Sequence, residues 1–348
     1  MRNIVLLCVE GAQQLKQSVV YSRALKGQGI KTAIFSPNSL PDSVLVREFD
    51  FQIGDLLAVP GFLKNVGLVL LFANESSPIC LTSIMVSKVA RLTGCSVISV
   101  QHGWIQPGLN YISNLSRTEF SGRQGDNSKA IHHFSPVIEW FGDDGIGFPF
   151  KNHEIDPVVP EHPEINFLVC SNFNWGVYSN ENIVGFLKSI KNLSVRLPSA
   201  NFCHRPHPAE KNMDLAGIIG FYSESFKNQQ LEWDSIDSAL AWADIVITTP
   251  STTALDSICK GKPVYIYDNG AFDSVLNQFK EICFTGEATL YSKICSLLSG
   301  GEYRFPNVKS FAPEKLVRRL QLEMAKSSEY KLSEGDFLEF IVQWKATR

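Results

Sequence analysis

The first cluster of chemically useful residues is Arg205-Pro206-His207-Pro208, which follows a strand predicted at 201–204. The Arg205 guanidinium is a rigid fork of donors that matches phosphate oxygens, and the His207 imidazole can exchange a proton near pH 7. Pro206 and Pro208 restrict the backbone on both sides of His207. The cluster therefore predicts a site for a departing phosphate. A proline-rich turn that carries a surface histidine is the alternative.

The second cluster joins a buried strand predicted at 245–248 to an apolar helix predicted at 252–259. Its hydroxyl-bearing residues are Thr249, Ser251, Thr252 and Thr253. Capping of the helix by Ser251 or Thr252 would explain the pattern on structural grounds alone. The same geometry directs N–H groups and hydroxyls at a helix N-terminus, where phosphate binds. The cluster lacks the Gly-x-x-x-x-Gly-Lys of a Walker loop, which disfavours ATP hydrolysis of that kind.

The third cluster, Gln101-His102-Gly103, follows a strand predicted at 96–100. A histidine at the carboxyl end of a strand, followed by glycine, can bring its ring and nearby N–H groups into a cleft. We therefore expect His102 to take part in catalysis and Gln101 and Gly103 to lie on the acceptor side. Glu10, which follows the first predicted strand, is assigned to the same side. The alternative is a turn with a solvent-facing histidine.

The elements that must position these clusters alternate between strand and helix. Strands are predicted at 4–9, 32–35, 66–72, 96–100, 166–170, 201–204, 245–248 and 263–267, and helices at 14–26, 81–92, 181–190, 236–243, 252–259, 314–324 and 334–344. This alternation predicts an α/β protein with two Rossmann-like doubly wound domains facing a central cleft. The expected divisions are an acceptor-side domain at 1–150, a proline-rich linker at 151–163, a donor domain at 164–310 and C-terminal helices at 311–348.

Composition narrows the ligand classes. The chain has 348 residues, 44% hydrophobic and 19% charged, as expected for a folded protein with two cores. Its net charge of -3 gives no bulk attraction to nucleic acid, so an anionic ligand must be held locally. The eight cysteines form no Cys-x-x-Cys pair, which indicates reduced thiols and a cytosolic protein. No segment approaches the roughly 20 apolar residues that span a bilayer.

The sequence resembles a family of enzymes. His207-Pro208, followed by Ala-Asp-Ile-Val-Ile-Thr-Thr-Pro-Ser-Thr-Thr-Ala-Leu-Asp, is similar to motifs of GT-B glycosyltransferases that build bacterial surface polysaccharides. Those that use cytidine-nucleotide donors are most similar: sialyltransferases, Kdo transferases and CDP-glycerol glycerophosphotransferases. Gln101-His102-Gly103 resembles a motif of several capsule-assembly enzymes. The resemblance implies that His207 acts on the leaving phosphate and that residues 251–253 bind it. Arg205, Pro208 and Thr249 are assigned to the same nucleotide site.

The resemblance also implies a catalytic base. Bacterial sialyltransferases carry an acidic motif before the His-Pro motif, and Gly142-Asp143-Asp144-Gly145 stands in that order here. Two adjacent carboxylates can raise the pKa of one of them, which suits a base near neutral pH. Asp-Asp-Gly is equally common as a turn. If it is a turn, His102 or another acid must deprotonate the acceptor.

The expected function is transfer of sialic acid or Kdo from a CMP-activated donor to a capsule or lipopolysaccharide glycan. Three alternatives stay open: a CDP-glycerol-type polyol-phosphate transferase, a UDP-GlcNAc 2-epimerase-like isomerase and an inactive glycan-binding module. Metal-independent chemistry without a cofactor is expected, since no Asp-x-Asp pattern for a donor-bound ion is present. A nucleotide sugar and a glycan or glycolipid are the expected partners. Basic residues at 315–326 offer contact with the inner face of the membrane, or a solvated helix face.

Overall fold

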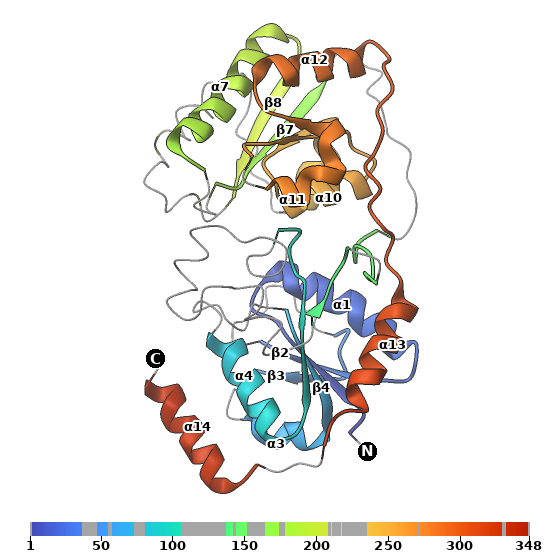
Figure 1. Ribbon diagram of the computed structural model, residues 1–348, viewed down its shortest axis with the longest axis vertical. Helices are drawn as coiled ribbons and strands as arrows, with labels where there is room; N and C mark the ends of the chain where they lie inside the picture. Colours follow the sequence, from blue (N-terminus) through green and yellow to red (C-terminus); the bar gives the residue numbers. More distant parts are fainter. Residues whose placement is uncertain are drawn as a thin grey trace.

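The computed structural model contains two α/β units stacked along the long axis of the molecule (Figure 1). The residues it describes are 2–36, 47–54, 58–72, 81–105, 137–141, 144–151, 164–173, 178–207, 210, 217, 235–270, 272–328 and 332–346. A parallel sheet lies at the centre of each unit, and helices cover it. The expected fold class, two doubly wound domains, is confirmed.

The first unit has a parallel sheet with the strand order β3-β2-β1-β4-β5-β6. Its strands are β1 (Ile4–Cys8), β2 (Lys31–Phe35), β3 (Phe51–Ile53), β4 (Val66–Leu71), β5 (Ser96–Val100) and β6 (Val137–Ile138). Its helical segments are α1 (Ala12–Lys26), α3 (Val59–Phe62), η2 (Leu63–Asn65) and α4 (Leu81–Leu92). The strand order changes direction between β1 and β4. In doubly wound sheets, ligands bind beyond the carboxyl ends of the strands at such a switch point.

The second unit has a parallel sheet with the order β11-β10-β9-β7-β8. Its strands are β7 (Asn166–Ser171), β8 (Asn201–Pro206), β9 (Ile245–Thr248), β10 (Val264–Tyr267) and β11 (Cys283–Phe284). Its helical segments are α7 (Asn180–Arg196), α9 (Ile236–Trp242), α10 (Thr252–Cys259), α11 (Asp273–Leu276), η4 (Asn277–Ile282) and α12 (Glu287–Leu298). Here the switch point lies between β7 and β9, so the second unit also has a preferred position for a ligand.

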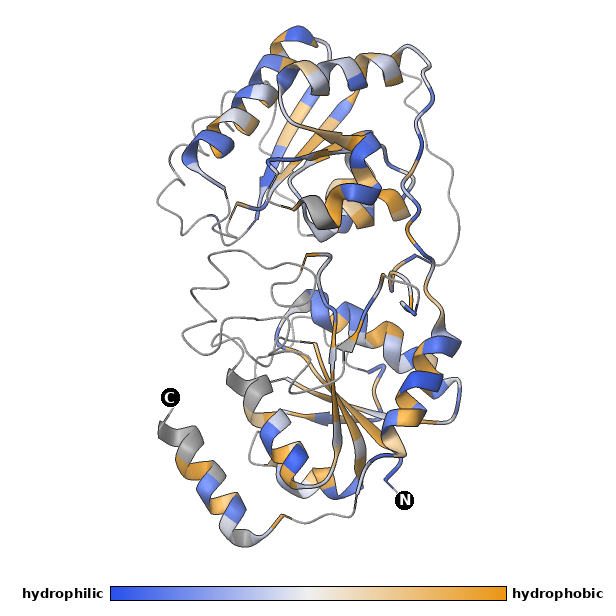
Figure 2. Cartoon of the chain, viewed as in Figure 1, coloured by the Kyte–Doolittle hydropathy of each residue, from blue (hydrophilic) through white to orange (hydrophobic). Residues whose placement is uncertain are grey.

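The strands are buried because helices cover both faces of each sheet. Every residue of β1, β4, β9 and β10 is buried, and their sequences are continuous apolar runs rather than alternating ones. Figure 2 shows the same contrast, with hydrophobic strands inside and mixed helices outside. Helix α7 begins at Ser179, whose hydroxyl accepts from the N–H of Asn182 at 3.2 Å in a capping box.

The chain crosses between the units twice, and the two crossings pair with each other. Phe148 forms a parallel bridge with Ser310, and the N–H of Phe311 donates to the Lys151 carbonyl at 2.7 Å. Gly147 has a φ of +82°, and a Cβ there would lie 2.0 Å from the Ser310 carbonyl oxygen, so only glycine fits. The start of the predicted linker is therefore part of a two-stranded connection, not a free tether.

After the second crossing the chain returns to the first unit. Helix α13 (Pro313–Met324) packs against α1 and β4, and α14 (Glu334–Ala346) packs against α4. The C-terminal helices thus complete the N-terminal unit, as Figure 1 shows in its lower half. The rest of the predicted linker, 152–163, lies outside the described residues, and the exact domain boundaries stay predictions.

The described cysteines are all free, as the sequence predicted. Within the same part of the chain, no helix has both the length and the apolar character needed to cross a membrane.

Candidate functional site

The carboxyl edge of the second sheet brings together the Arg205 and Ser251 clusters. Cys170 of β7 lies opposite Arg205 of β8 on one side and opposite Thr248 of β9 on the other. The Thr249 N–H donates to the Cys170 carbonyl at 3.2 Å, directly at the switch point between β7 and β9. The two predicted halves of a phosphate site therefore occupy one edge, three neighbouring strands wide. Pro208 lies outside the described residues.

Ser251 caps helix α10. Its backbone is extended, with φ −157° and ψ 164°, and its hydroxyl accepts from the N–H of Thr253 at 3.2 Å. The Thr248 hydroxyl lies 3.4 Å from the Ser251 hydroxyl. Thr249 is fully buried, and its hydroxyl has no hydrogen-bond partner among the described residues. Buried hydroxyls usually have a partner, so a ligand oxygen beside this helix N-terminus would complete the set.

His207 extends from the end of β8 at this edge. Its N–H donates to the Ser171 carbonyl at 3.1 Å, which ties the turn after β8 to the end of β7. Partial burial, and then the charge of Arg205, hold the pKa of His207 below its usual value. His207 is therefore neutral at pH 7 and can accept a proton. A bound phosphate would offset Arg205 and favour the protonated form.

A buried network that the motifs did not reveal holds this turn in place. Glu210 is 1% exposed, and its two carboxylate oxygens accept from the Ser171 hydroxyl at 2.7 Å and from the Phe173 N–H at 2.6 Å. The Glu210 N–H in turn donates to the His207 carbonyl at 2.9 Å. Ser171 also lies 2.9 Å from Nε2 of His204. Glu210 therefore joins the ends of β7 and β8 to the His207 turn.

The protonation states in this network follow from burial. Burial lowers the pKa of His204 to about 4, so its ring is neutral, and burial raises the pKa of Glu210. The Ser171 hydroxyl donates to Glu210, so His204 supplies the Nε2–H that Ser171 accepts. Glu210 follows Pro208 by two residues, and a carboxylate so close to the His-Pro pair was the available sequence signal.

Gln101 braces the loop after β5 from inside the protein. It is 2% exposed, and its side-chain oxygen accepts from the Trp140 N–H at 2.7 Å. Its amide nitrogen donates to the carbonyls of Gly103 and Trp104 at 3.0 and 3.2 Å. Contact between Gln101 and an acceptor would break these bonds. Both ends of its amide are occupied within the protein, and the acceptor-side role of Gln101 stays a prediction.

The loop after β5 reaches the second unit. The Trp104 N–H donates to the Thr252 hydroxyl at 3.0 Å, and the fully buried Trp104 ring meets the Phe279 ring edge-on at 4.6 Å. Gly103 passes close to the same hydroxyl. The His102 ring beside it has a pKa lowered to about 4 by burial, so it is neutral at pH 7. The loop that carries Gln101-His102-Gly103 therefore contacts the hydroxyl cluster at the start of α10, across the boundary between the two units.

A second contact between the units surrounds a cavity of about 240 Å³. Lys16 of α1 pairs with Asp237 of α9 at 2.9 Å, and Lys260 pairs with the same carboxylate at 3.1 Å. Asp256 of α10 also lines the cavity. Burial, and then repulsion from Asp237, raise the pKa of Asp256 to about 7, although both lysines oppose the shift. Asp256 is thus a carboxyl group that titrates near neutral pH in an interdomain cavity.

The predicted acidic motif lies elsewhere. Asp143 is outside the described residues, and Asp144 is an exposed side chain in a groove beside α13. Among the described residues that line this groove of about 750 Å³, Asp144 alone was predicted for the site. Its role as the catalytic base stays a prediction, and the lining residues around it include Lys315, Arg318 and Arg319 of α13. Glu10 follows β1 at the first sheet's switch point, and its N–H donates to the Gln14 side chain at 2.6 Å.

The described residues include no group of three or more histidine, cysteine or acidic side chains that could hold a metal ion. The described groups at the His207 edge are Arg205, two neutral imidazoles, hydroxyls and a helix N-terminus. These groups bind and stabilise negative charge on phosphate.

Solved structures of nucleotide-sugar enzymes share this arrangement of two units. Staphylococcus aureus MnaA, in a co-structure with UDP, has a TM-score of 0.58 at 10% identity, covering 95% of this chain and 99% of that one. The fold is GT-B-like. UDP-GlcNAc 2-epimerase of Methanocaldococcus jannaschii has a TM-score of 0.58 at 13% identity, covering 92% and 99%. A glycosyltransferase of Rickettsia africae ESF-5 has a TM-score of 0.52 at 13% identity, covering 99% and 98%.

No protein-family model and no curated protein matches the sequence. The structural likeness, at 10–13% identity, establishes the fold alone. Of the reactions that the sequence left open, epimerases and glycosyltransferases both occur among the similar structures. The cytidine-donor group expected from the motifs has no counterpart among these three.

Proposed function

We propose that this protein is an enzyme that binds a nucleotide-activated sugar at the carboxyl edge of the second sheet and acts on its sugar–phosphate bond. One observation carries the proposal: β8, which ends in Arg205-Pro206 before His207, and β9, which leads to the N-terminus of α10, flank β7 and end at the same carboxyl edge of the sheet. The buried Thr249 hydroxyl supports the proposal. It has no hydrogen-bond partner among the described residues, and an oxygen of the ligand would supply one. Similar structures solved with UDP support the ligand class.

The proposed roles follow from the chemistry of each group. The α10 N-terminus, with Ser251 and Thr253, binds phosphate oxygens through N–H groups and hydroxyls. Arg205 neutralises charge on the leaving phosphate. His207, held in position through Glu210, transfers a proton to or from that phosphate. Contact between Trp104 and Thr252 keeps water away from this end of the site.

Uridine diphosphate is the nucleotide that the comparisons favour, and a cytidine nucleotide ranks second on the motifs. Isomerisation of a UDP-N-acetylhexosamine is the first reaction to test, because structures of UDP-GlcNAc 2-epimerases reach TM-scores of 0.53–0.58. Transfer to a glycan is the second, favoured by the separate groove beside α13 that leaves room for another ligand. In that second case the expected acceptor is a surface polysaccharide, and contact with the membrane stays a prediction.

One incubation separates these reactions. The purified chain is mixed with UDP-GlcNAc alone, and the products are followed by NMR and by release of UDP. A new 2-epimer without an acceptor supports isomerisation. Release of UDP that depends on an added glycan supports transfer, and the same assay with CMP-sialic acid tests the cytidine reading. Absence of binding to UDP, CDP and CMP would contradict the whole proposal.

A further inference from the structure

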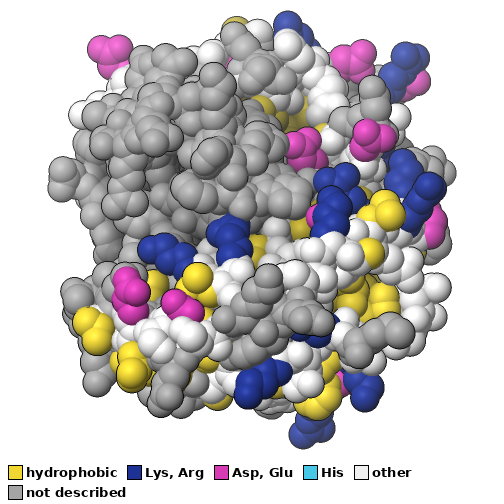
Figure 3. Space-filling view, turned by 60° about the horizontal axis from the view of Figure 1, so that its bottom comes forward, with side chains coloured by type: hydrophobic (Ala, Val, Ile, Leu, Met, Phe, Trp, Pro, Cys, Tyr) yellow, Lys and Arg dark blue, Asp and Glu magenta, His cyan; other side chains and the backbone are white. Residues whose placement is uncertain are grey.

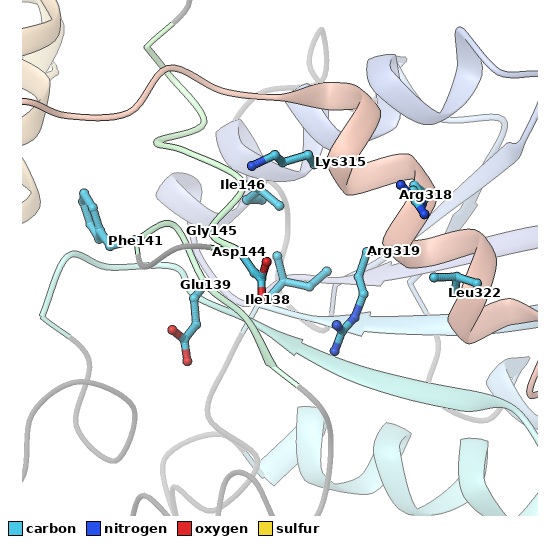
Figure 4. Close-up of a pocket in the computed structure, with 10 residues that line it drawn as sticks. All are labelled: Ile138, Glu139, Phe141, Asp144, Gly145, Ile146, Lys315, Arg318, Arg319 and Leu322. Carbon is cyan, nitrogen blue, oxygen red and sulfur yellow. The ribbon is translucent and has the colours of Figure 1, made fainter.

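A groove of about 750 Å³ lies between α13 and the segment that follows β6. Figure 4 shows its ten described lining residues, with Lys315 extending from the helix toward Ile146. A volume of this size suits a ligand larger than a single small ion. The groove uses none of the residues assigned above to the nucleotide.

One wall of the groove is positively charged. Lys315, Arg318 and Arg319 are spaced i, i+3 and i+4, so they share one face of α13. The opposite face of the helix is fixed by buried Leu316 and Leu320. Arg319 lies 3.7 Å from Glu323, whereas Lys315 and Arg318 have no ion pair within the described part of the chain. The wall therefore keeps positive charge available for an anion.

The other wall carries carboxylates: Glu139 and Asp144 line the groove there. The Ile146 N–H donates to the Glu139 carbonyl at 3.0 Å, which ties the backbone at Ile146 to the end of β6. At Gly145 a Cβ would be 2.6 Å from the Trp140 carbonyl oxygen, so no side chain fits. The backbone next to each carboxylate is therefore packed against its neighbour.

The two walls do not neutralise each other, since no ion pair between the described residues crosses the groove. Lysine and arginine side chains bind carboxylate or phosphate groups, and carboxylates accept hydrogen bonds from hydroxyl groups. Half-buried Phe141 and exposed Leu322 add apolar surface. A ligand that fits all three features has negative charge, several hydroxyls and an apolar ring face. We propose that this groove binds an acidic saccharide.

Saccharide binding at this groove goes beyond the nucleotide proposal and does not depend on it. The anionic substituents contact Lys315 and Arg318, and ring hydroxyls donate to Asp144 and Glu139. If the chain transfers sugar, the groove holds acidic units of the acceptor. Binding is measured without any nucleotide, so failure of the nucleotide proposal and failure of this inference give different results.

The test is titration calorimetry with hexagalacturonate, an acidic saccharide, and with maltohexaose as its neutral counterpart. The wild-type chain is expected to bind hexagalacturonate at least 10-fold more tightly. Arg318→Glu should weaken that binding about 10-fold or more, because an attractive contact becomes repulsive. Asp144→Asn should weaken it about threefold while leaving binding of sulfate unchanged.

Figure 3 shows lysine and arginine side chains at many places on one face, so general attraction of an anion needs a control. Lys188→Glu makes a charge reversal on exposed α7, in the other unit. It should change the affinity less than twofold. Equal loss in Lys188→Glu and Arg318→Glu would overturn the inference. So would equal binding of the neutral hexasaccharide, tighter binding by Asp144→Asn, or preference for a hexaglutamate peptide over hexagalacturonate.

Discussion

The backbone N–H of Trp104 donates to the hydroxyl of Thr252 at 3.0 Å, across the boundary between the two units. Trp104 follows the last strand but one of the first sheet, and Thr252 begins the helix whose N-terminus forms the proposed phosphate site. The loop after β5 and the N-terminus of α10 are therefore in direct contact.

Removal of the Thr252 hydroxyl should loosen this contact. Thr252→Val keeps the shape of the side chain and leaves the Trp104 N–H without its partner. We expect the unfolding free energy to fall by about 1–3 kcal/mol, the cost of an unsatisfied buried donor. Unfolding by denaturant, monitored through tryptophan fluorescence, measures this loss of unfolding free energy.

Thr289, in the first turn of α12, offers the matched control. Its hydroxyl is exposed and donates to the Gly286 carbonyl at 2.8 Å. Thr289→Val should cost less than Thr252→Val. Equal stability of the wild type and Thr252→Val would contradict the bridging role of Thr252.

Arg205 should control part of the proton affinity of His207. Burial is the larger cause of the lowered pKa of His207, and Arg205 is the second. Arg205→Gln is therefore expected to raise that pKa part of the way toward 6.5, and Arg205→Lys should leave it lowered because the charge stays. NMR titration of the imidazole protons reports both. A pKa of His207 that is the same in Arg205→Gln and Arg205→Lys would exclude the electrostatic link.

Glu210 should stabilise the His207 turn. Glu210→Gln replaces one acceptor oxygen by a donor, so either the Ser171 hydroxyl or the Phe173 N–H loses its partner. The expected cost is about 1–3 kcal/mol of unfolding free energy. Glu302 is an exposed carboxylate paired with Arg304, so Glu302→Gln should cost less than Glu210→Gln.

Urea unfolding of both glutamine variants makes that comparison. A loss in Glu210→Gln no larger than in Glu302→Gln would show that Glu210 does not hold the turn.

Asp256 should make stability depend on pH between about 4 and 7. The folded protein keeps this carboxyl protonated up to about pH 7, whereas the unfolded chain releases the proton near 3.8. The folded state binds more protons in that window, so the contribution of Asp256 to stability falls as pH rises through it and is constant above pH 7. Asp256→Asn removes this dependence.

The gain in stability from Asp256→Asn should therefore be larger at pH 8 than at pH 5, by about 2–3 kcal/mol. Thermal unfolding at both pH values measures the difference. Asp50→Asn is the control, because the pKa of Asp50 is lowered and this group does not titrate between pH 5 and 8. A pH dependence that is unchanged in Asp256→Asn would rule out the neutral titration.

The sequence predicted those elements whose local pattern is strong. The helix at 81–92 and the strands at 96–100 and 245–248 have the predicted bounds, because each is a continuous apolar or periodic run between turn residues. Short edge strands were missed. β3 (Phe51–Ile53), β6 (Val137–Ile138) and β11 (Cys283–Phe284) have two or three residues, and neighbouring strands rather than their own sequences define them.

The residues of the candidate site also differ in whether the sequence indicated them. The sequence indicated that the Arg205 and Ser251 clusters share one edge, because the first ends β8 and the second follows β9, and the parallel topology brings such ends together. Glu210, Asp256 and Lys16 were not assigned, since their importance arises from burial and from contacts between segments distant in the chain. Asp144 was assigned from its motif alone, and its position beside α13 depends on the return of the chain.

Nucleotide binding at the N-terminus of α10 is the central claim, and calorimetry with UDP tests it most directly. Ser251→Ala removes the hydroxyl that caps α10 at this site. Ser333→Ala is the control: it removes the hydroxyl that caps α14, where Ser333 accepts from the Asp336 N–H at 3.1 Å. Each change costs a helix cap worth about 1 kcal/mol. We predict that UDP binds the wild type and Ser333→Ala equally and Ser251→Ala about 10-fold more weakly. Equal binding by both variants, or no binding by the wild type, would contradict the account.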